Sequence, residues 1–265
     1  MIKIVKITSK ILKQKRTIRV FTPDMSKGPF SVLYMHDGQN LFTAETSFAG
    51  EIWDVANQVE RLMKAGVIPP TMVVGIDNNK YRLDEYAPFD NSHIFEKYET
   101  KFRKPYYGDQ YTEFIVKELK PWIDKNYRTR ADFTHTFIAG SSMGGLISLY
   151  AGLKYKTVFG VVGVFSPSTW WNETGTEAML SVLPANKEQG YYLTAGTNES
   201  GKWDKKENAK YIKTTKHIHK SLSKQVKHYH FDLIEGGMHN EPFWALQMSD
   251  FLRFTHQLNN QQEGM

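Results

Sequence analysis

The chain has 265 residues, of which 40% are apolar and 23% charged, and it contains 16 Phe, 14 Tyr and 6 Trp. This composition is typical of a globular domain and excludes a disordered or collagen-like chain. The formal net charge is +6, which on its own would suit an anionic partner, and the chain has no cysteine. Disulfides, thiolate metal sites and a cysteine nucleophile are therefore excluded.

The predicted elements begin with two segments rich in β-forming residues, Lys3–Thr8 and Arg16–Phe21, which we expect to form an antiparallel pair. Short apolar runs typical of buried strands follow at Val32–Met35, Met72–Ile76, Thr136–Ala139, Val158–Phe165, Tyr191–Ala195 and Tyr229–Ile234. Helical patterns lie at Trp53–Ala65, Tyr111–Asp124, Met143–Leu153, Glu207–Leu222 and Phe243–Leu258. Strands that alternate with helices predict an α/β fold with a mostly parallel twisted sheet and helices on both faces.

No internal repeat or Gly/Ser-rich linker divides this pattern, so we expect a single domain over residues 1–258 and a frayed polar tail at 259–265. The segment 78–108 fits no element, and loops of that length are usually functional. No apolar run is long enough to span a membrane, and the first residues lack the apolar core of a signal peptide. We therefore expect a cytoplasmic location and no membrane partner.

The excess of positive charge is concentrated in one segment. Between residues 202 and 227, nine lysines recur every three or four positions, while apolar residues recur on the opposite side. This pattern predicts an amphipathic helix with a solvated lysine face. A nucleic-acid surface would instead combine arginines and aromatic residues along a stripe, so we expect no nucleic-acid partner.

A candidate nucleophile follows the predicted strand at 136–139. Gly140-Ser141-Ser142-Met143-Gly144 matches the pattern G-x-S-x-G and leads directly into a helical pattern. A serine on a sharp strand-to-helix turn exposes its hydroxyl, and small neighbours let the backbone turn. The pattern predicts that Ser142 is a nucleophile. The alternatives are a structural glycine-rich turn and a phosphate-binding loop.

A serine nucleophile needs a base to take its proton and an acid to orient that base. In this type of sheet the acid and then the histidine follow the serine, each just past the end of a later strand. Glu199 and His239 occupy those two places, so we predict that they are the acid and the base. Asp204, five residues beyond Glu199, remains an alternative acid.

The negative charge that forms on a substrate carbonyl oxygen needs backbone N–H donors. The residue after the nucleophile, Met143, offers one. Gln39, in the turn His36-Asp37-Gly38-Gln39 after the first buried strand, is the candidate for the second. An ordinary strand-to-helix turn is the alternative interpretation of that segment.

Four further residues are candidates for binding the substrate. Trp53, Trp170 and Trp171 lie in or beside loops that could surround Ser142, and an aromatic wall suits a phenolic acyl group or a sugar face. Packing in the core is the alternative for each of them. Arg82 could bind an anionic substrate or could form an ion pair that fixes its loop.

Four segments together resemble the putative-esterase (esterase D-like) family of α/β hydrolases. They are Met35-His36-Asp37-Gly38-Gln39-Asn40-Leu41-Phe42, Gly140-Ser141-Ser142-Met143-Gly144-Gly145, Ser166-Pro167-Ser168-Thr169-Trp170-Trp171 and Gly237-Met238-His239-Asn240-Glu241 with Trp244. The resemblance implies an α/β-hydrolase fold, Ser142 as nucleophile and His239 as base. It also implies Glu199 as the acid, although relatives such as enterochelin, feruloyl and acetyl-xylan esterases and S-formylglutathione hydrolase often carry Asp there.

We therefore expect a serine carboxylic-ester hydrolase that acts through a Ser-His-Glu triad and an acyl-enzyme on small acyl or aromatic esters. The expected partner is a small-molecule ester, no cofactor is expected, and no metal-ligand spacing such as H-E-x-x-H occurs. An acyltransferase that uses the same triad and a non-catalytic binding module on a hydrolase fold are the alternatives. The oligomeric state is left open.

Overall fold

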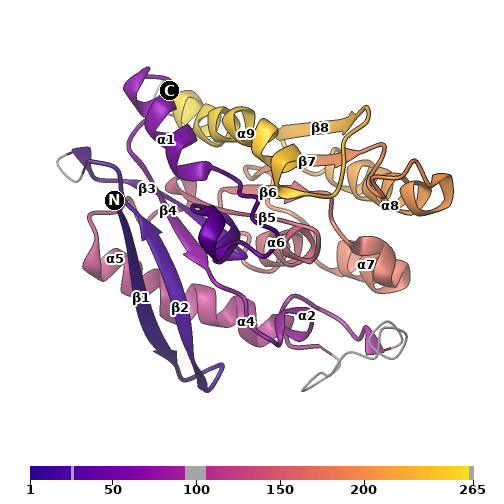
Figure 1. The fold of residues 1–265 in the computed structure, drawn as a ribbon, viewed down its shortest axis with the longest axis horizontal. Helices are drawn as coiled ribbons and strands as arrows, with labels where there is room; N and C mark the ends of the chain where they lie inside the picture. The colour runs from indigo at the N-terminus through magenta and orange to yellow at the C-terminus, as the bar shows by residue number, and fades with distance from the viewer. Residues whose placement is uncertain (25–26, 93–105, 263–265) are drawn as a thin grey trace.

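A single eight-stranded sheet runs through the molecule (Figure 1). The computed structural model describes residues 1–24, 27–92 and 106–262, and the side chains of the last helix as far as Gln257. The strands are β1 (Ile2–Ser9), β2 (Gln14–Phe21), β3 (Ser31–His36), β4 (Thr71–Ile76), β5 (Thr136–Ser141), β6 (Val161–Phe165), β7 (Gly190–Gly196) and β8 (His228–Ile234). Their order across the sheet is β1-β2-β4-β3-β5-β6-β7-β8.

The pairing of the strands confirms the predicted fold class. β1 pairs with β2 in antiparallel register, with Ile2 opposite Phe21, and β2 pairs antiparallel with β4. All other neighbours, from β4 through β3 to β8, are parallel. The sheet is therefore mostly parallel, with an antiparallel pair at its N-terminal edge.

Helices cover both faces of this sheet. They are α1 (Val55–Lys64), α2 (Arg82–Glu85), α4 (Gly108–Phe114), α5 (Lys120–Asn126), α6 (Met143–Lys154), α7 (Glu173–Val182), α8 (Lys205–Leu222) and α9 (Glu241–Gln262). Figure 1 shows α1 and α9 together on one side, where they share an apolar cluster with one face of the central strands. Helices α4 to α8 contribute to a second cluster on the opposite face.

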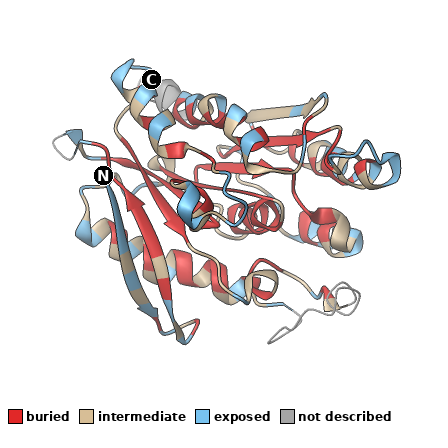
Figure 2. Cartoon of the chain, in the orientation of Figure 1, coloured by how far each residue is buried: buried red, intermediate tan, exposed pale blue. Residues whose placement is uncertain are grey.

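The central strands are buried on both faces because helices pack against each side. Every residue of β3, β4, β5, β6 and β7 is buried, whereas β1 at the sheet edge is mostly exposed (Figure 2). Runs of apolar residues without alternation are expected in such strands. In a sheet of this kind, ligands bind beyond the carboxyl ends of the parallel strands, which is where the candidate site lies.

Some boundaries differ from the predicted ones. The predicted helix 111–124 begins at Gly108 and continues through a π-helical turn, Ile115–Leu119, into α5. Helix α7 was not predicted because its sequence, ETGTEAMLSV, contains glycine and threonine, which favour helices weakly. The residues 259–262, predicted as a frayed tail, lie in α9, and 263–265 fall outside the described residues. Part of the unassigned segment 78–108 forms α2, while 93–105 are likewise not described.

Candidate active site

Ser142 occupies a sharp turn between β5 and α6. Its backbone has φ 60° and ψ −126°, a conformation that costs free energy in a residue with a side chain. The turn is held by its N–H, which donates to the Phe165 carbonyl at 3.0 Å. A Cβ on Gly140 would lie 2.8 Å from the backbone of Gly144, so the turn closes only with glycine there. Strain of this kind is typical of a nucleophile held at the end of a strand.

His239 and Glu199 form a direct pair beside this turn. The Nδ1 atom of His239 lies 2.7 Å from Glu199 Oε2, with the carboxylate fully buried and 23% of the histidine side chain exposed. The two loops that carry them are joined by a hydrogen bond from Asn198 N–H to the Gly237 carbonyl at 3.0 Å. A Cβ on Gly196 would lie 2.0 Å from that carbonyl oxygen, so the loops approach this closely only because residue 196 is glycine.

A chain of donors sets the direction of the hydrogen bonds around this pair. The indole N–H of Trp244 donates to Ser166 Oγ at 3.0 Å, and Ser166 Oγ donates to Glu199 Oε1 at 2.6 Å. The Gly196 N–H donates to the same oxygen at 2.7 Å. Because an indole can only donate, the Ser166 hydrogen must point to the carboxylate. Glu199 Oε2 then accepts the Nδ1 hydrogen of His239, which leaves Nε2 with a free lone pair.

Two aromatic rings hold the imidazole in place. The ring centroids of Tyr211, from α8, and Trp244, from α9, each lie 5.0 Å from that of His239. Trp244 meets the imidazole edge to face, at 82°. His239 is therefore oriented by contacts from two helices as well as by Glu199.

The hydroxyl of Ser142 has a partner that the sequence patterns did not predict. Its Oγ lies 3.1 Å from Ser168 Oγ, just after β6, and no hydrogen bond within the described ranges joins it directly to His239. Ser166 and Tyr211 were also missed. Ser166 and Ser168 follow the end of a buried strand at the same edge of the sheet as Ser142. That position in the sequence could have indicated that they lie near the nucleophile.

Asp204, the alternative acid, has a different role in the structure. It precedes α8, and its side chain accepts hydrogen bonds from the Lys206 and Glu207 N–H groups at 2.9 and 3.1 Å. This is the geometry of a helix N-cap. The carboxylate that contacts His239 is that of Glu199.

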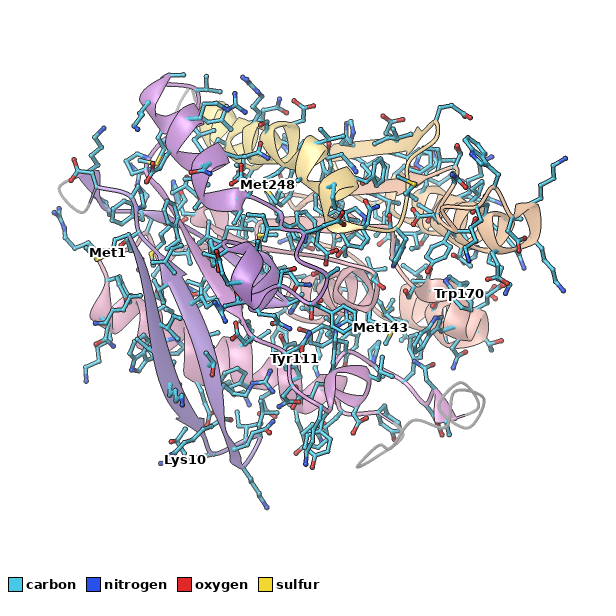
Figure 3. All side chains as sticks on the ribbon, in the orientation of Figure 1. Met1, Lys10, Tyr111, Met143, Trp170 and Met248 are labelled. Carbon is cyan, nitrogen blue, oxygen red and sulfur yellow. The ribbon has the colours of Figure 1, made fainter. Side chains whose placement is uncertain are left out.

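The two predicted oxyanion donors lie at the starts of helical turns. Met143 is the first residue of α6, labelled near the centre of the molecule in Figure 3, and Gln39 lies in the short 3-10 turn Gly38–Asn40 after β3. N–H groups in the first turn have no partner inside the helix, and no hydrogen bond from either of these two N–H groups is found among the described residues. Gln39 and Ser142 line the same cavity, of about 590 Å³.

Arg82 holds the turn that carries Gln39. Its guanidinium forms a two-pronged ion pair with Asp37, with both N–O distances 2.8 Å. Burial alone would raise the pKa of Asp37. The charge and hydrogen bonds of Arg82 and a hydrogen bond from Asn78 outweigh that effect, so the pKa of Asp37 is below its ordinary value. Arg82 therefore forms the ion pair that fixes its loop, one of the two roles considered for it. The Arg82 side chain also lines the cavity that contains Ser142.

His239 also lines a second cavity, of about 700 Å³. The three predicted tryptophans differ in their relation to the two cavities. Trp170, labelled in Figure 3, lines the second cavity. Its ring centroid lies 5.6 Å from that of Tyr211. Trp171 packs beside it, 5.9 Å between ring centroids, but lines neither cavity. Trp53 is 2% exposed and stacks on Trp244 in the core, so we do not retain it as a binding residue.

Within the described ranges, no group of three or more His, Asp or Glu side chains is arranged to hold a metal ion. None of the helices in those ranges is long and apolar enough to cross a membrane.

The sheet topology, with a strained serine after β5, defines an α/β hydrolase fold. Solved structures share it. One is the BES protein from Bacillus cereus, with a TM-score of 0.75, 22% identity and coverage of 96% of this chain and 94% of that one. Another is the enterobactin esterase from Shigella flexneri, with a TM-score of 0.74, 20% identity and coverage of 97% of this chain but 59% of that one.

The chain belongs to the family described as "Putative esterase", whose family model matches residues 9–255. It is accordingly a carboxylic ester hydrolase. It is similar to the uncharacterized protein YbbA of Bacillus subtilis, with 26% identity over 88% of both chains. It is also 44% identical to the iron(III) enterobactin esterase of Escherichia coli, but only over 61 residues, or 23% of this chain and 14% of that protein.

Proposed function

We propose that this esterase is a serine hydrolase in which Ser142 is the nucleophile, His239 the general base and Glu199 the acid that orients it. The observation that carries the proposal is the 2.7 Å contact between His239 and the fully buried Glu199 carboxylate. The pair lies beside a serine whose backbone is strained and whose side chain lines the same cavity as His239.

The proposed reaction has two halves. His239 Nε2 takes the Ser142 proton as Oγ attacks the ester carbonyl carbon, and the Glu199 charge stabilises the imidazolium. The imidazolium then gives its proton to the leaving alcohol as the ester C–O bond breaks, which leaves an acyl group on Ser142. Water attacks this acyl-enzyme with His239 again as base, and the carboxylic acid leaves while the proton returns to Ser142.

The Met143 and Gln39 N–H groups are the proposed oxyanion donors. Removing one such donor costs roughly 3 to 4 kcal/mol of transition-state stabilisation in related chemistry. The Arg82–Asp37 pair supports this role because it fixes the turn from which Gln39 projects.

For the substrate we propose esters with a planar aromatic acyl group. Trp170 and Tyr211 line the cavity adjoining His239, and aromatic rings stack well on such walls. A solved structure that shares this fold and is named as a ferulic acid esterase supports this class. Location in the cytoplasm and the absence of a nucleic-acid partner remain predictions from the sequence.

The test is intact-mass analysis after exposure to a fluorophosphonate, followed by turnover of p-nitrophenyl acetate, feruloyl esters and trilactone siderophores. We expect one adduct on the wild type and none on Ser142→Ala or His239→Ala. A folded wild type that neither labels nor turns over any ester would contradict the proposal and favour a non-catalytic binding module. Transfer of the acyl group to added glycerol or glutathione in preference to water would favour the acyltransferase.

A further inference from the structure

The nucleophile is held by a second serine. Ser142 Oγ lies 3.1 Å from Ser168 Oγ, and the Ser168 N–H donates to the Ser142 carbonyl at 3.0 Å. Ser168 is 1% exposed. The backbone hydrogen bond positions residue 168 against Ser142 whatever its side chain, so the hydroxyl contact can be removed alone.

The direction of the hydrogen bond between the two serines decides what it does, since each hydroxyl has one hydrogen. In the proposed reaction Ser142 gives its hydrogen to His239 Nε2, so its Oγ accepts from Ser168.

The contact between the two hydroxyls then runs in one direction. Ser168 then has its hydrogen available for Ser142 Oγ. The Ser142 hydrogen in turn remains available for His239 Nε2. Hydroxyls aligned in one direction polarise one another, which strengthens each donor in the series.

We propose that the Ser168 hydroxyl is a catalytic group that donates a hydrogen bond to Ser142 Oγ. The inference depends on the proposed role of Ser142 as nucleophile. As the Ser142 proton moves to His239 and Oγ bonds to the carbonyl carbon, Ser168 stabilises the negative charge that develops on Oγ. When the acyl-enzyme breaks down, the Oγ–carbon bond breaks, the proton returns from His239, and Ser168 stabilises the departing oxygen.

The opposite role for the same contact predicts the opposite sign. If Ser168 merely held Ser142 away from His239 in the free enzyme, removing its hydroxyl would free the nucleophile and raise the rate. Ser168→Ala therefore separates the two roles by the direction of its effect.

The experiment compares Ser168→Ala and Ser168→Thr with Thr169→Val. Thr169 is the next residue, and its buried hydroxyl has no hydrogen-bond partner among the described residues, so it is a matched control for loss of a buried hydroxyl. The measurements are the rate of fluorophosphonate labelling, and the burst and steady-state phases of p-nitrophenyl acetate hydrolysis. Urea unfolding reports whether each variant is folded.

Because hydrogen bonds to charged groups are stronger than neutral ones, we expect Ser168→Ala to slow labelling, acylation and deacylation by about ten- to a hundredfold. Thr169→Val should stay within about twofold of the wild type. Ser168→Thr keeps a hydroxyl and should recover most of the rate. If that variant fails to fold, Ser168→Cys, whose thiol is a weak donor, should react at a rate between those of Ser168→Ala and the wild type.

Equal or faster labelling by Ser168→Ala would overturn the proposal, as would equal losses in Ser168→Ala and Thr169→Val. No recovery in the folded hydroxyl- or thiol-bearing variant would also overturn it. Failure of the proposed function gives a different result, because the wild type itself would then not label.

Discussion

Replacing Glu199 by glutamine tests how the acid acts, because the change keeps the side chain's shape and removes its charge. Glu199 Oε1 accepts from two donors, Gly196 N–H and Ser166 Oγ, and Oε2 accepts from His239 Nδ1. An amide has one oxygen and one NH2 group. Since the Gly196 N–H cannot be reversed and Ser166 is held as a donor by Trp244, the amide oxygen must take the Oε1 place.

The NH2 group of the introduced glutamine would then face Nδ1 of His239 as a donor. The imidazole would have to carry its hydrogen on Nε2, and it could no longer accept the proton of Ser142. Loss of a charge-assisted hydrogen bond alone would cost about 1.5 to 3 kcal/mol. A wrong tautomer costs about 10⁴-fold in kcat in a serine protease triad, or about 5 kcal/mol. The donor arrangement around Glu199 favours the larger loss.

The assay is kcat/KM for p-nitrophenyl acetate, with the rate of fluorophosphonate labelling as a second readout. Urea unfolding establishes that the variant is folded. Asp204→Asn is the matched comparison, because it removes a carboxylate from the alternative acid but keeps a side chain that caps helices well. A folded Glu199→Gln within about tenfold of the wild type would refute the tautomer reasoning, and a larger loss in Asp204→Asn would move the acid to Asp204.

Three further predictions concern stability. Burial is the main cause that lowers the pKa of His36 and of His256 to about 3. Between pH 6.5 and 3 the unfolded chain therefore binds protons that the folded chain does not, and the free energy of unfolding falls as the pH falls. His256→Gln should reduce the slope of unfolding free energy against pH by about 1.4 kcal/mol per unit near pH 5 in urea titrations, and an unchanged slope would contradict this. Asp204→Ala should lower the free energy of unfolding by about 1 kcal/mol and reduce turnover far less than Glu199→Gln does. No measurable destabilisation would argue against Asp204 as the N-cap of α8. Gly196→Ala should lower the free energy of unfolding by at least about 3 kcal/mol and reduce turnover, because the new Cβ would meet the Gly237 carbonyl. A variant as stable as the wild type would show that the two loops can separate freely.

The fold was predictable because its signals are local. Each central strand is a short run of apolar residues bounded by polar or turn residues, and strands of this kind need helices on both faces. The three residues of the proposed triad were predictable for the same reason, since each follows the carboxyl end of a strand. Helix α7 was missed because its threonines and glycine weaken the helical pattern, whereas Asn172, whose side chain accepts from the Gly175 N–H, caps its start.

The surroundings of the proposed triad were less predictable because they depend on contacts between elements that are distant in the chain. Nothing near Tyr211 in the sequence indicates that its ring will lie 5.0 Å from His239, since that contact depends on how α8 packs against the sheet. Trp53 and Trp170 looked alike as loop tryptophans, yet one stacks in the core and the other lines a cavity. Side-chain chemistry thus identifies which groups could react, while the packing of helices on the sheet decides which hydroxyls and rings surround them. The proposed role of Ser168 belongs to this second kind of information, so it is best tested by removing single contacts.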